Sequence, residues 1–448
     1  MARRRVLLLS HIDYDAYHHA DGSPFFAPDE YDVTFVADRR HVARLRTGPL
    51  PPEIGETIAT RLKDDTAVST LLEALARTAE CDYVVALQER LLLPAARFRE
   101  ALGLPGPGVA QTLLLRDKIA MKRHFAAHGV RVPDHIEIRE PRDASAHLAR
   151  HGRIVIKPVD GSGSFDINVI SDRQQLAALH RRGLRGPHRY EAEEFVDGRQ
   201  FHIDSIVRAG TPLATSVSQY LDSHESFPLG GQIRSHTLDP GPERRRLTEF
   251  NAKVLSCLPR FDGVTHLEAF LDPDGEPVFC EIAGRPGGAG IVTTFQHAHG
   301  ASLLLAGVLP QIGRPVPDPA PPGTVQRTAP GAAPRTQEVP STGWSLIYPP
   351  ALGRFQSYDS LPSAPWLLQL TTPLTPGDLV TASRRSTDVL ATIAVSGVDS
   401  REVVAHLDGA QAEITATIVQ DPIAGGAERF EPLTFASAGR DAYEVDPD

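Results

Sequence analysis

The chain has 448 residues, too many for one compact core, and at about 100–200 residues per domain we expect about three domains. Its formal net charge of −10 argues against a general nucleic-acid-binding protein, which needs a basic face. No apolar run reaches the ~18–20 residues of a membrane span. The apolar run at the N-terminus ends at Ser10, which predicts a first strand rather than a secretory signal. Three widely spaced cysteines without a CxxC pair argue against disulfides and structural zinc, and they favour a reducing cytoplasm.

Strands and helices alternate through the first 112 residues. This order predicts an N-terminal α/β domain with a parallel sheet. Because no GxGxxG motif follows the first strand, no dinucleotide site is predicted there. The expected strands are residues 6–9, 33–37 and 83–86, and the expected helices are residues 66–79 and 95–102.

The next region, residues 113–313, combines helices with antiparallel strand pairs. The sequence Arg116-Asp117-Lys118 begins a helix and Gly129 ends it. A turn at Asp197-Gly198 predicts one hairpin, and a turn at 272–275 predicts a second. The first hairpin is expected to pair residues 190–196 with 201–207, and the second to pair 264–271 with 277–282. The other expected elements are a strand at 136–138, a helix near 144–150, a strand at 154–156 and a helix at 247–258.

Residues 314–340 are rich in Pro, Gly, Ala and Thr, which predicts a linker. Beyond it, short apolar segments alternate with turns and indicate a small β-rich terminal domain. These segments are residues 344–347, 366–370, 389–395 and 413–418. The polar tail from Ala436 is expected to fray.

A lysine and a glycine-rich loop follow the buried strand 154–156. Lys157 ends the strand, and residues 161–164 read Gly-Ser-Gly-Ser. Glycines let backbone N–H groups approach phosphate oxygens, and a lysine neutralises their charge. The chain has only five lysines against 41 arginines, so a lysine here favours a function that needs a compact point charge. The alternative is a surface hairpin with an incidental lysine.

Two glutamates lie on the strands of the second predicted hairpin. The turn at 272–275 lets Glu268 and Glu281 face each other across the ladder. Facing carboxylates repel unless a cation bridges them, and Mg²⁺ binds carboxylates together with substrate phosphates. The pair therefore predicts a magnesium site.

Four motifs in this order resemble those of the ATP-grasp ligases. They are Arg116-Asp117-Lys118 with residues 129–133, Ile156-Lys157-Pro158 with the loop 161–164, the segment 193–198, and the strands 266–270 and 281–288. The resemblance covers roughly residues 80–310 and, more loosely, the whole chain. It implies a multidomain fold of the α/β and α+β classes. The domains would be an N-terminal parallel α/β (pre-ATP-grasp) domain at 1–112, an ATP-grasp domain at 113–313, and a linker with a β-rich C-terminal domain at 314–448. The small lobe would span about 113–192 and the large lobe about 193–313.

The resemblance also implies the chemistry. ATP, with Mg²⁺ or Mn²⁺, phosphorylates a carboxylate, and an amine then attacks the acyl phosphate and releases phosphate. The partners would be small-molecule carboxylate and amine substrates, and members of the family are commonly homodimers. The implied nucleotide-binding residues are Lys118, Lys157, Gly161, Ser162, Gly163, Ser164, Glu193, Glu194, Phe195, Val196 and Gln200. Glu268 and Glu281 would bind metal, and Lys157 and Arg285 would act in catalysis, with Arg285 holding the acyl phosphate.

Two residues depart from the family pattern. Gln200 stands where many members have a glutamate that binds the ribose, and Ala283 stands where many have an asparagine that binds the second metal. Some peptide-forming members are similar at these positions, which favours an amide ligase. We interpret His266 as a hydrogen-bonded core histidine, with a catalytic role as the alternative. The candidate substrate residues are Glu225, Arg234 and His236 in a polar loop, and Gly287 and Gly288 after Arg285.

Two other functions stay open. A biotin-carboxylase-like or formate-using enzyme would activate bicarbonate or formate, although no biotin-accepting Met-Lys-Met segment is present. A nucleotide-binding protein with altered activity would be consistent with Gln200 and Ala283.

Overall fold

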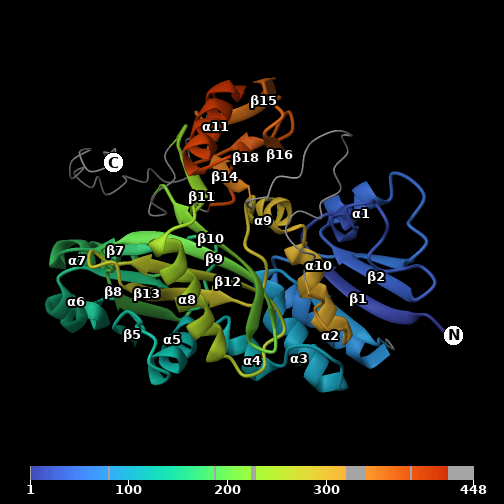
Figure 1. Cartoon of the computed structure of the whole chain (residues 1–448), viewed down its shortest axis with the longest axis horizontal. Coiled ribbons are helices and arrows are strands. Elements are labelled where there is room, and N and C mark those ends of the chain that lie inside the picture. The colour runs from blue at the N-terminus through green and yellow to red at the C-terminus, as the bar shows by residue number, and fades with distance from the viewer. Residues whose placement is uncertain are drawn as a thin grey trace.

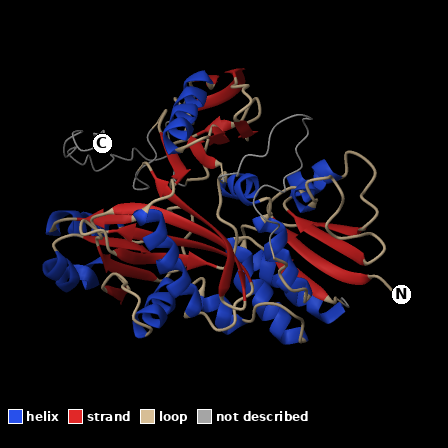
Figure 2. Ribbon diagram, viewed as in Figure 1, coloured by secondary structure: helices blue, strands red, loops and turns tan. Residues whose placement is uncertain are grey.

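The computed structural model describes residues 2–78, 81–185, 188–222, 229–318, 340–383 and 386–421. Figure 1 shows an N-terminal α/β region beside a large central sheet, a smaller sheet at the opposite end of that large sheet, and the C-terminal elements above it. Strands form the centre of each region, and helices cover their faces (Figure 2). No helix in these described ranges is both long and apolar enough to cross a membrane.

The N-terminal region confirms the predicted parallel sheet. Its strand order is β3-β2-β1-β4, and all three pairings are parallel. The expected helix at 95–102 is confirmed as the second part of α3, which ends at Gly103 in the left-handed conformation with φ 65°. The edge strand β3 was not predicted, since its polar sequence Ile-Gly-Glu-Thr-Ile-Ala gives a weak strand signal. The elements are β1 (Arg4–Ser10), β2 (Tyr31–Ala37), α1 (Arg39–Leu45), β3 (Ile54–Ala59), α2 (Asp65–Thr78), β4 (Tyr83–Ala86) and α3 (Leu92–Leu102).

A second, smaller sheet follows two connecting helices. Its order is β5-β8-β6-β7, and every pairing is antiparallel. The side chain of Asp117 caps helix α5 by accepting hydrogen bonds from the backbone N–H groups of Ile119 and Ala120. The elements are α4 (Val109–Leu114), α5 (Lys118–Ala127), β5 (His135–Ile138), α6 (Ser145–His151), β6 (Ile154–Pro158), β7 (Asn168–Ile170), α7 (Arg173–Arg182) and β8 (Tyr190–Glu194).

The predicted hairpin around Asp197-Gly198 is wrong. Strand β8 belongs to the small sheet, whereas β9 (Arg199–Arg208) belongs to the large one, where it pairs with β10 and β12. Close backbone contact explains the glycine, because a Cβ at Gly198 would lie 2.3 Å from the carbonyl oxygen of Leu271. The segment between β8 and β9 is therefore a connection between two sheets, not a turn within one.

The large sheet has eight strands in the order β13-β12-β9-β10-β11-β14-β18-β16. Alternate residues of β9 face opposite sides, as the pleat requires. Ile203 and Val207 pack in one core with Leu247 of α8, whereas Ile206 packs in another with Ile291 of α9. The elements are β10 (Thr211–Tyr220), β11 (Gln232–Thr237), α8 (Pro242–Ser256), β12 (Gly263–Leu271), β13 (Pro277–Ala283), α9 (Ile291–His299) and α10 (Leu303–Val308).

Three of the C-terminal strands, β14, β18 and β16, continue the large sheet, whereas β17, β15 and β19 form a separate three-stranded sheet. Strand β14 pairs with β11 in an antiparallel register from Gln232↔Ile347 to His236↔Gly343. The β-rich character of this region agrees with the sequence, but the helix α11 was not predicted. Most of the predicted linker and the whole tail from Ala436 lie outside the described residues. The elements are β14 (Ser341–Ile347), β15 (Gly353–Ser360), β16 (Leu367–Thr371), β17 (Leu379–Val380), β18 (Ala391–Gly397), α11 (Ser400–Glu413) and β19 (Thr415–Val419).

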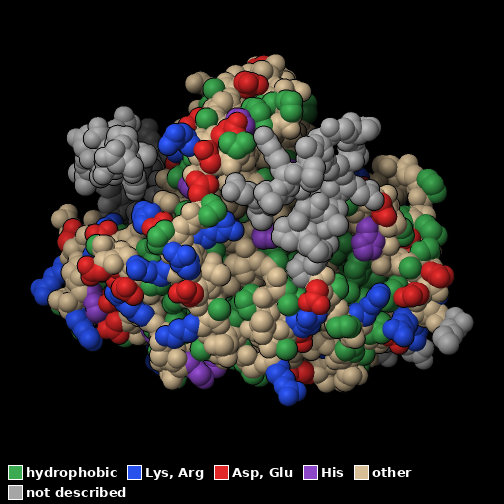
Figure 3. All heavy atoms as spheres, viewed as in Figure 1, with side chains coloured by type: hydrophobic (Ala, Val, Ile, Leu, Met, Phe, Trp, Pro, Cys, Tyr) green, Lys and Arg blue, Asp and Glu red, His purple; other side chains and the backbone are tan. Residues whose placement is uncertain are grey.

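Acidic and basic side chains are interspersed over the face of the molecule drawn in Figure 3.

Candidate functional site

Lys118 links the glycine-rich loop to the glutamate pair. It is the first residue of α5, and its Nζ donates to the carbonyl oxygen of Gly161 at 3.0 Å. The same Nζ lies 2.7 Å from Oε2 of Glu281. Three residues that are far apart in the sequence thus meet where the small sheet faces β12 and β13.

Two buried lysines share two buried glutamates inside the small sheet. Lys157 on β6 contacts Glu193 on β8, and its Nζ lies 3.9 Å from Oε1 of Glu191. From α5, Lys122 contacts Glu193 and reaches Oε1 of Glu191 at 2.6 Å. Burial alone would raise the pKa of Glu193, but the charges of Lys122 and Lys157 lower it to about 2.

Sequence reasoning identified Lys157 and Glu193 in this cluster and missed Lys122. A signal was present, because Lys122 lies one helical turn after Lys118 and is one of the five lysines in the chain.

The glutamate pair has the register that the sequence predicts. Glu268 on β12 is directly opposite Glu281 on β13. Nε2 of Gln200 donates to Oε2 of Glu268 at 3.0 Å, and the hydroxyl of Tyr220 donates to Oε1 at 3.2 Å. Both carboxylates keep some solvent access, with 19% and 30% of the two side chains exposed. The pair is therefore anchored by neighbours and still open to a ligand.

His266 lies two residues before Glu268 and is held by a buried aspartate. Nδ1 of His266 lies 2.8 Å from Oδ1 of Asp204, and Nδ1 of His202 lies 2.6 Å from Oδ2. Burial would lower the pKa of His266, but Asp204 and Glu268 raise it to about 10. The Nε2 atom of His266 faces Oε1 of Glu268 at 3.5 Å. The hydrogen bond of His266 to Asp204 agrees with the predicted core role, whereas the contact with Glu268 places it at the site.

Arg285 reaches the N-terminal region. Its guanidinium contacts Glu89, a residue that sequence reasoning missed, and NH1 donates to the carbonyl oxygen of Pro286 at 2.7 Å. Arg116 pairs with the same carboxylate, its Nε lying 3.4 Å from Oε1 of Glu89. Burial would raise the pKa of Glu89, but Arg285 and Arg116 hold it below its usual value. No local motif marks Glu89, because only the packing of the N-terminal domain brings it to Arg285.

The glycines after Arg285 lie beside the same cluster. A Cβ at Gly287 would lie 2.8 Å from Nδ1 of His266 and 2.5 Å from Cδ1 of Ile291, whereas a Cβ at Gly288 would meet no atom within 4 Å. Gly287 is therefore a close-packing position and Gly288 an open one.

The connection between the two sheets binds the small sheet through Phe195. Phe195 N donates to the carbonyl oxygen of Arg153 at 3.1 Å, and the guanidinium of Arg153 lies 3.5 Å from the centre of the Phe195 ring. Within the described part of the chain, Val196 N makes no hydrogen bond. In the glycine-rich loop, Gly163 and Ser164 take left-handed φ values of 64° and 55°, and Ser386 N of the C-terminal region donates to the carbonyl oxygen of Gly163 at 3.3 Å.

Two of the candidate substrate residues are not brought to the glutamate pair. Arg234 and His236 were expected in a polar loop, but both lie on strand β11. Their side chains point to the face opposite that of Ser235, whose Oγ lies 2.7 Å from Nε2 of His202 on the site face. Arg234 is instead paired with Asp222 at 2.9 Å and with Asp408 at 2.6 Å. His236 is buried on the same side as Arg234. Glu225 lies outside the described residues.

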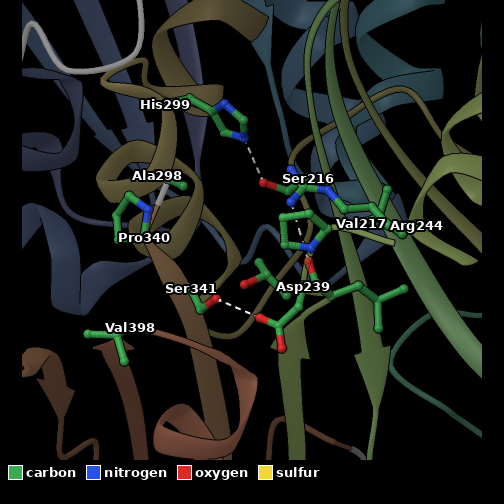
Figure 4. A pocket seen from close by; sticks show the side chains of 12 residues that line it. Ser216, Val217, Asp239, Arg244, Ala298, His299, Pro340, Ser341 and Val398 are labelled. Atoms are coloured by element: carbon green, nitrogen blue, oxygen red, sulfur yellow. Dashed lines mark hydrogen bonds between the residues drawn. The ribbon is translucent and has the colours of Figure 1, made fainter. Parts of the chain in front are cut away.

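A separate cavity of about 200 Å³ lies at the other end of α9 (Figure 4). Figure 4 shows the imidazole of His299 directed at Ser216, with Nε2 and Oγ 2.9 Å apart, and Ser341 directed at Asp239. Burial lowers the pKa of His299 to about 4, so this imidazole is neutral at neutral pH. None of the residues lining the cavity is a site residue predicted from sequence.

Two family models match the chain. An ATP-grasp N-terminal domain matches residues 31–106, and an ATP-grasp domain matches residues 115–289, so the two together span more than half of the sequence. The second match contains the lysines, the connection between sheets, the glutamate pair and Arg285.

Several individual ligases are similar to the chain in sequence. The L-arginine-specific L-amino acid ligase of Bacillus subtilis is 27% identical over 255 residues, which cover 54% of this chain and 60% of that protein. A D-alanine–D-alanine ligase of Gloeobacter violaceus is 24% identical over 42% of this chain and 65% of its own length. The chain thus aligns with less than two thirds of each of these relatives.

Solved structures share the fold over nearly the whole chain. The L-amino acid ligase of Bacillus licheniformis superposes with a TM-score of 0.70 at 20% identity, covering 94% of this chain and 100% of that one. The biotin carboxylase domain of the Hydrogenobacter thermophilus 2-oxoglutarate carboxylase gives a TM-score of 0.65 at 13% identity, covering 94% and 92%. With the two family models, this likeness establishes that the chain belongs to the ATP-grasp superfamily.

Proposed function

We propose that the protein is an ATP-dependent carboxylate–amine ligase that joins an amino acid, or a peptide-like acid, to an amine through an acyl phosphate. The observation that carries the proposal is the meeting of Lys118, Gly161 and the Glu268–Glu281 pair at the junction of the two sheets. Phosphoryl transfer to a substrate requires a cationic side chain that binds the phosphates, and here such a side chain lies beside two solvent-accessible carboxylates.

The nucleotide would lie between the small sheet and β12–β13. Lys118 and Lys157 would neutralise the phosphates, while N–H and O–H groups of residues 161–164 would donate to their oxygens. The unpartnered Val196 N suits the edge of the adenine, beside Glu193, Glu194 and Phe195. Gln200 would bind the ribose through its amide, which also bonds Glu268.

Mg²⁺ suits the two facing glutamates, because their oxygens are the hard ligands that this ion prefers. When bound, the ion supplies charge neutralisation on the transferring phosphoryl group. Ala283 offers no ligand, and its partner across the ladder is His266. We infer that Mg²⁺ would depend more on Glu281 and the phosphates because the asparagine is missing.

In the reaction, a carboxylate oxygen of the first substrate attacks the γ-phosphorus as the bond to ADP breaks. The amine of the second substrate then attacks the acyl carbon, phosphate leaves, and the amine nitrogen loses a proton. Arg285 would hold the acyl phosphate, with its guanidinium oriented by Glu89. Gly287 keeps the backbone close to His266, so that this part of the site stays narrow.

Amino acid substrates are supported by the named activities of the relatives, an L-amino acid ligase and D-alanine–D-alanine ligases. The site also has an aromatic wall. The ring of Tyr220 lies 4.9 Å from the ring of His202 and 5.9 Å from that of Trp344, centre to centre. Trp344 is buried, and its Nε1 makes no hydrogen bond within the described chain. These aromatic rings would suit a substrate with an apolar or aromatic side chain.

A matrix of amino acids and amines tests the proposal, scored by phosphate release and product mass. We expect phosphate release that requires both substrates, with a product mass equal to their sum minus one water. Turnover that depends on bicarbonate or formate would instead support a carboxylase-like enzyme, and ATP binding without turnover would support a nucleotide-binding protein.

A further inference from the structure

Two histidines and an aspartate meet at one end of α6 in the small sheet region. His147 and His151 are one turn apart on the helix, with ring centres 4.4 Å apart. A ring nitrogen from each histidine and a carboxylate oxygen of Asp134 all lie within 4.8 Å of one another. His147 is 5% exposed, so the cluster is built into the domain rather than scattered on its surface.

Several polar atoms of the cluster have protein partners. Nε2 of His151 lies 3.0 Å from Oδ2 of Asp134, while Nδ1 lies 3.3 Å from Oε2 of Glu194. Nε2 of His147 lies 3.2 Å from the backbone carbonyl oxygen of Asp134. An imidazole that bonds a carboxylate or a backbone carbonyl through one nitrogen is fixed in orientation, as histidines in metal sites commonly are.

We propose that His147, His151 and Asp134 bind a divalent transition-metal ion such as Zn²⁺ or Co²⁺, with Glu194 orienting His151. Two imidazoles and one carboxylate suit a borderline ion, whereas Mg²⁺ prefers oxygen ligands alone. The Glu268–Glu281 pair, with its hard oxygen ligands, would thus bind a different class of ion. Asp134 also accepts a hydrogen bond from Glu194 N at 2.9 Å, so the bound ion would tie α6 to the end of β8.

The positive charge of Arg150 disfavours binding of the ion. Its NH1 lies 3.1 Å from Oδ2 of Asp134, but its side chain is 73% exposed and can move into solvent. Removing this charge should therefore strengthen metal binding without disturbing the fold.

A second histidine pair provides a matched control. His124 on α5 and His128 at its C-cap have the same spacing and the same 4.4 Å between ring centres. Among the described residues, no aspartate or glutamate completes that pair into a group that could hold an ion.

The test is a Co²⁺ titration of the untagged, full-length protein in excess Mg²⁺, followed by the visible absorption of the bound cobalt and by competition with Zn²⁺. The Mg²⁺ competes with Co²⁺ at the glutamate pair. We expect one cobalt per chain, and affinity at least about tenfold weaker in His151→Ala and Asp134→Asn. Arg150→Gln should bind more tightly, and His124→Ala should match the wild type.

Unchanged affinity in His151→Ala and Asp134→Asn would overturn the proposal, as would an equal loss in His124→Ala. If His151→Ala fails to fold, Arg150→Gln decides, because equal or weaker binding by this variant contradicts the assigned role of Asp134. None of these outcomes depends on turnover, so the metal site and the ligase activity are tested separately.

Discussion

The ammonium group of Lys122 contacts the carboxylate of Glu193 with neither group open to more than a trace of solvent. Lys157 contacts the same carboxylate from the neighbouring strand. Three of the five lysines of the chain, Lys118, Lys122 and Lys157, thus lie along one path from α5 to β6. Two of them hold Glu193 in place, while Lys118 reaches the glutamate pair.

Replacing Lys122 should destabilise the fold strongly. Lys122→Met leaves Glu191 and Glu193 with one lysine fewer in a buried setting, and breaking such a pair costs about 3–5 kcal/mol. Denaturant unfolding measures this loss. Lys253→Met is the control, because this exposed lysine donates only to the carbonyl oxygen of Gly129, and a surface change is usually within about 0.5 kcal/mol. Equal stability of the two variants would contradict the role of Lys122.

The loss of folding stability at acidic pH should depend on Glu193. Its pKa in the folded state is about 2, below the ordinary value of 4.5, so its contribution is present above pH 4.5 and is lost as the pH falls towards 2. Glu193→Gln should therefore be less stable than the wild type at neutral pH, and the difference should shrink over that window. Unfolding free energies measured from pH 7 to pH 2 check this. The control is Glu249→Gln at an exposed position, whose unfolding free energy should change with pH as that of the wild type does.

Lys157→Ala and Glu281→Ala should each abolish turnover. Lys157→Ala removes a charge near the phosphates, and Glu281→Ala removes half of the glutamate pair. We therefore expect the rate of phosphate release to fall by more than about 100-fold in each variant. Lys253→Ala should keep full activity. Wild-type rates in either site variant would remove the basis of the nucleotide and metal assignments.

Two glycines after Arg285 should differ in their tolerance of a methyl group. In Gly290→Ala, the new Cβ would lie 2.5 Å from Cβ of Trp344, so the start of α9 must shift, at a cost of about 1–3 kcal/mol. In Gly288→Ala, the new Cβ meets nothing within 4 Å. Thermal unfolding should show a lower Tm for Gly290→Ala alone, and a reversed order would mean that α9 packs differently.

Local patterns predicted the parts of the site that depend on a single motif. The turn at 272–275 was sufficient to predict that Glu268 faces Glu281, and the strand ending at Lys157 was sufficient to indicate a phosphate loop. The contact of Arg285 with Glu89 could not be predicted, because it joins two domains. The buried pairing of Asp204 with His266 depends on the register between β9 and β12, which no turn specifies.

The wrong prediction of a hairpin at Asp197-Gly198 has a physical cause. A two-residue turn signal between strands is the same whether the strands pair with each other or with different neighbours. Here β9 finds a longer partner in β12, with nine residues in register from Gly263↔Val207 to Leu271↔Arg199, and β8 pairs with β5 and β6. Long-range pairing therefore overrides the local signal.

The pairing of β11 with β14 makes β14, β18 and β16 part of the large sheet. A rotation of the small sheet about residues 195–198 would occur against this whole sheet. Such a rotation has to separate Ser386 from Gly163, which are in contact through one hydrogen bond. The C-terminal region thus contacts the glycine-rich loop directly, although the two lie more than 200 residues apart in the sequence.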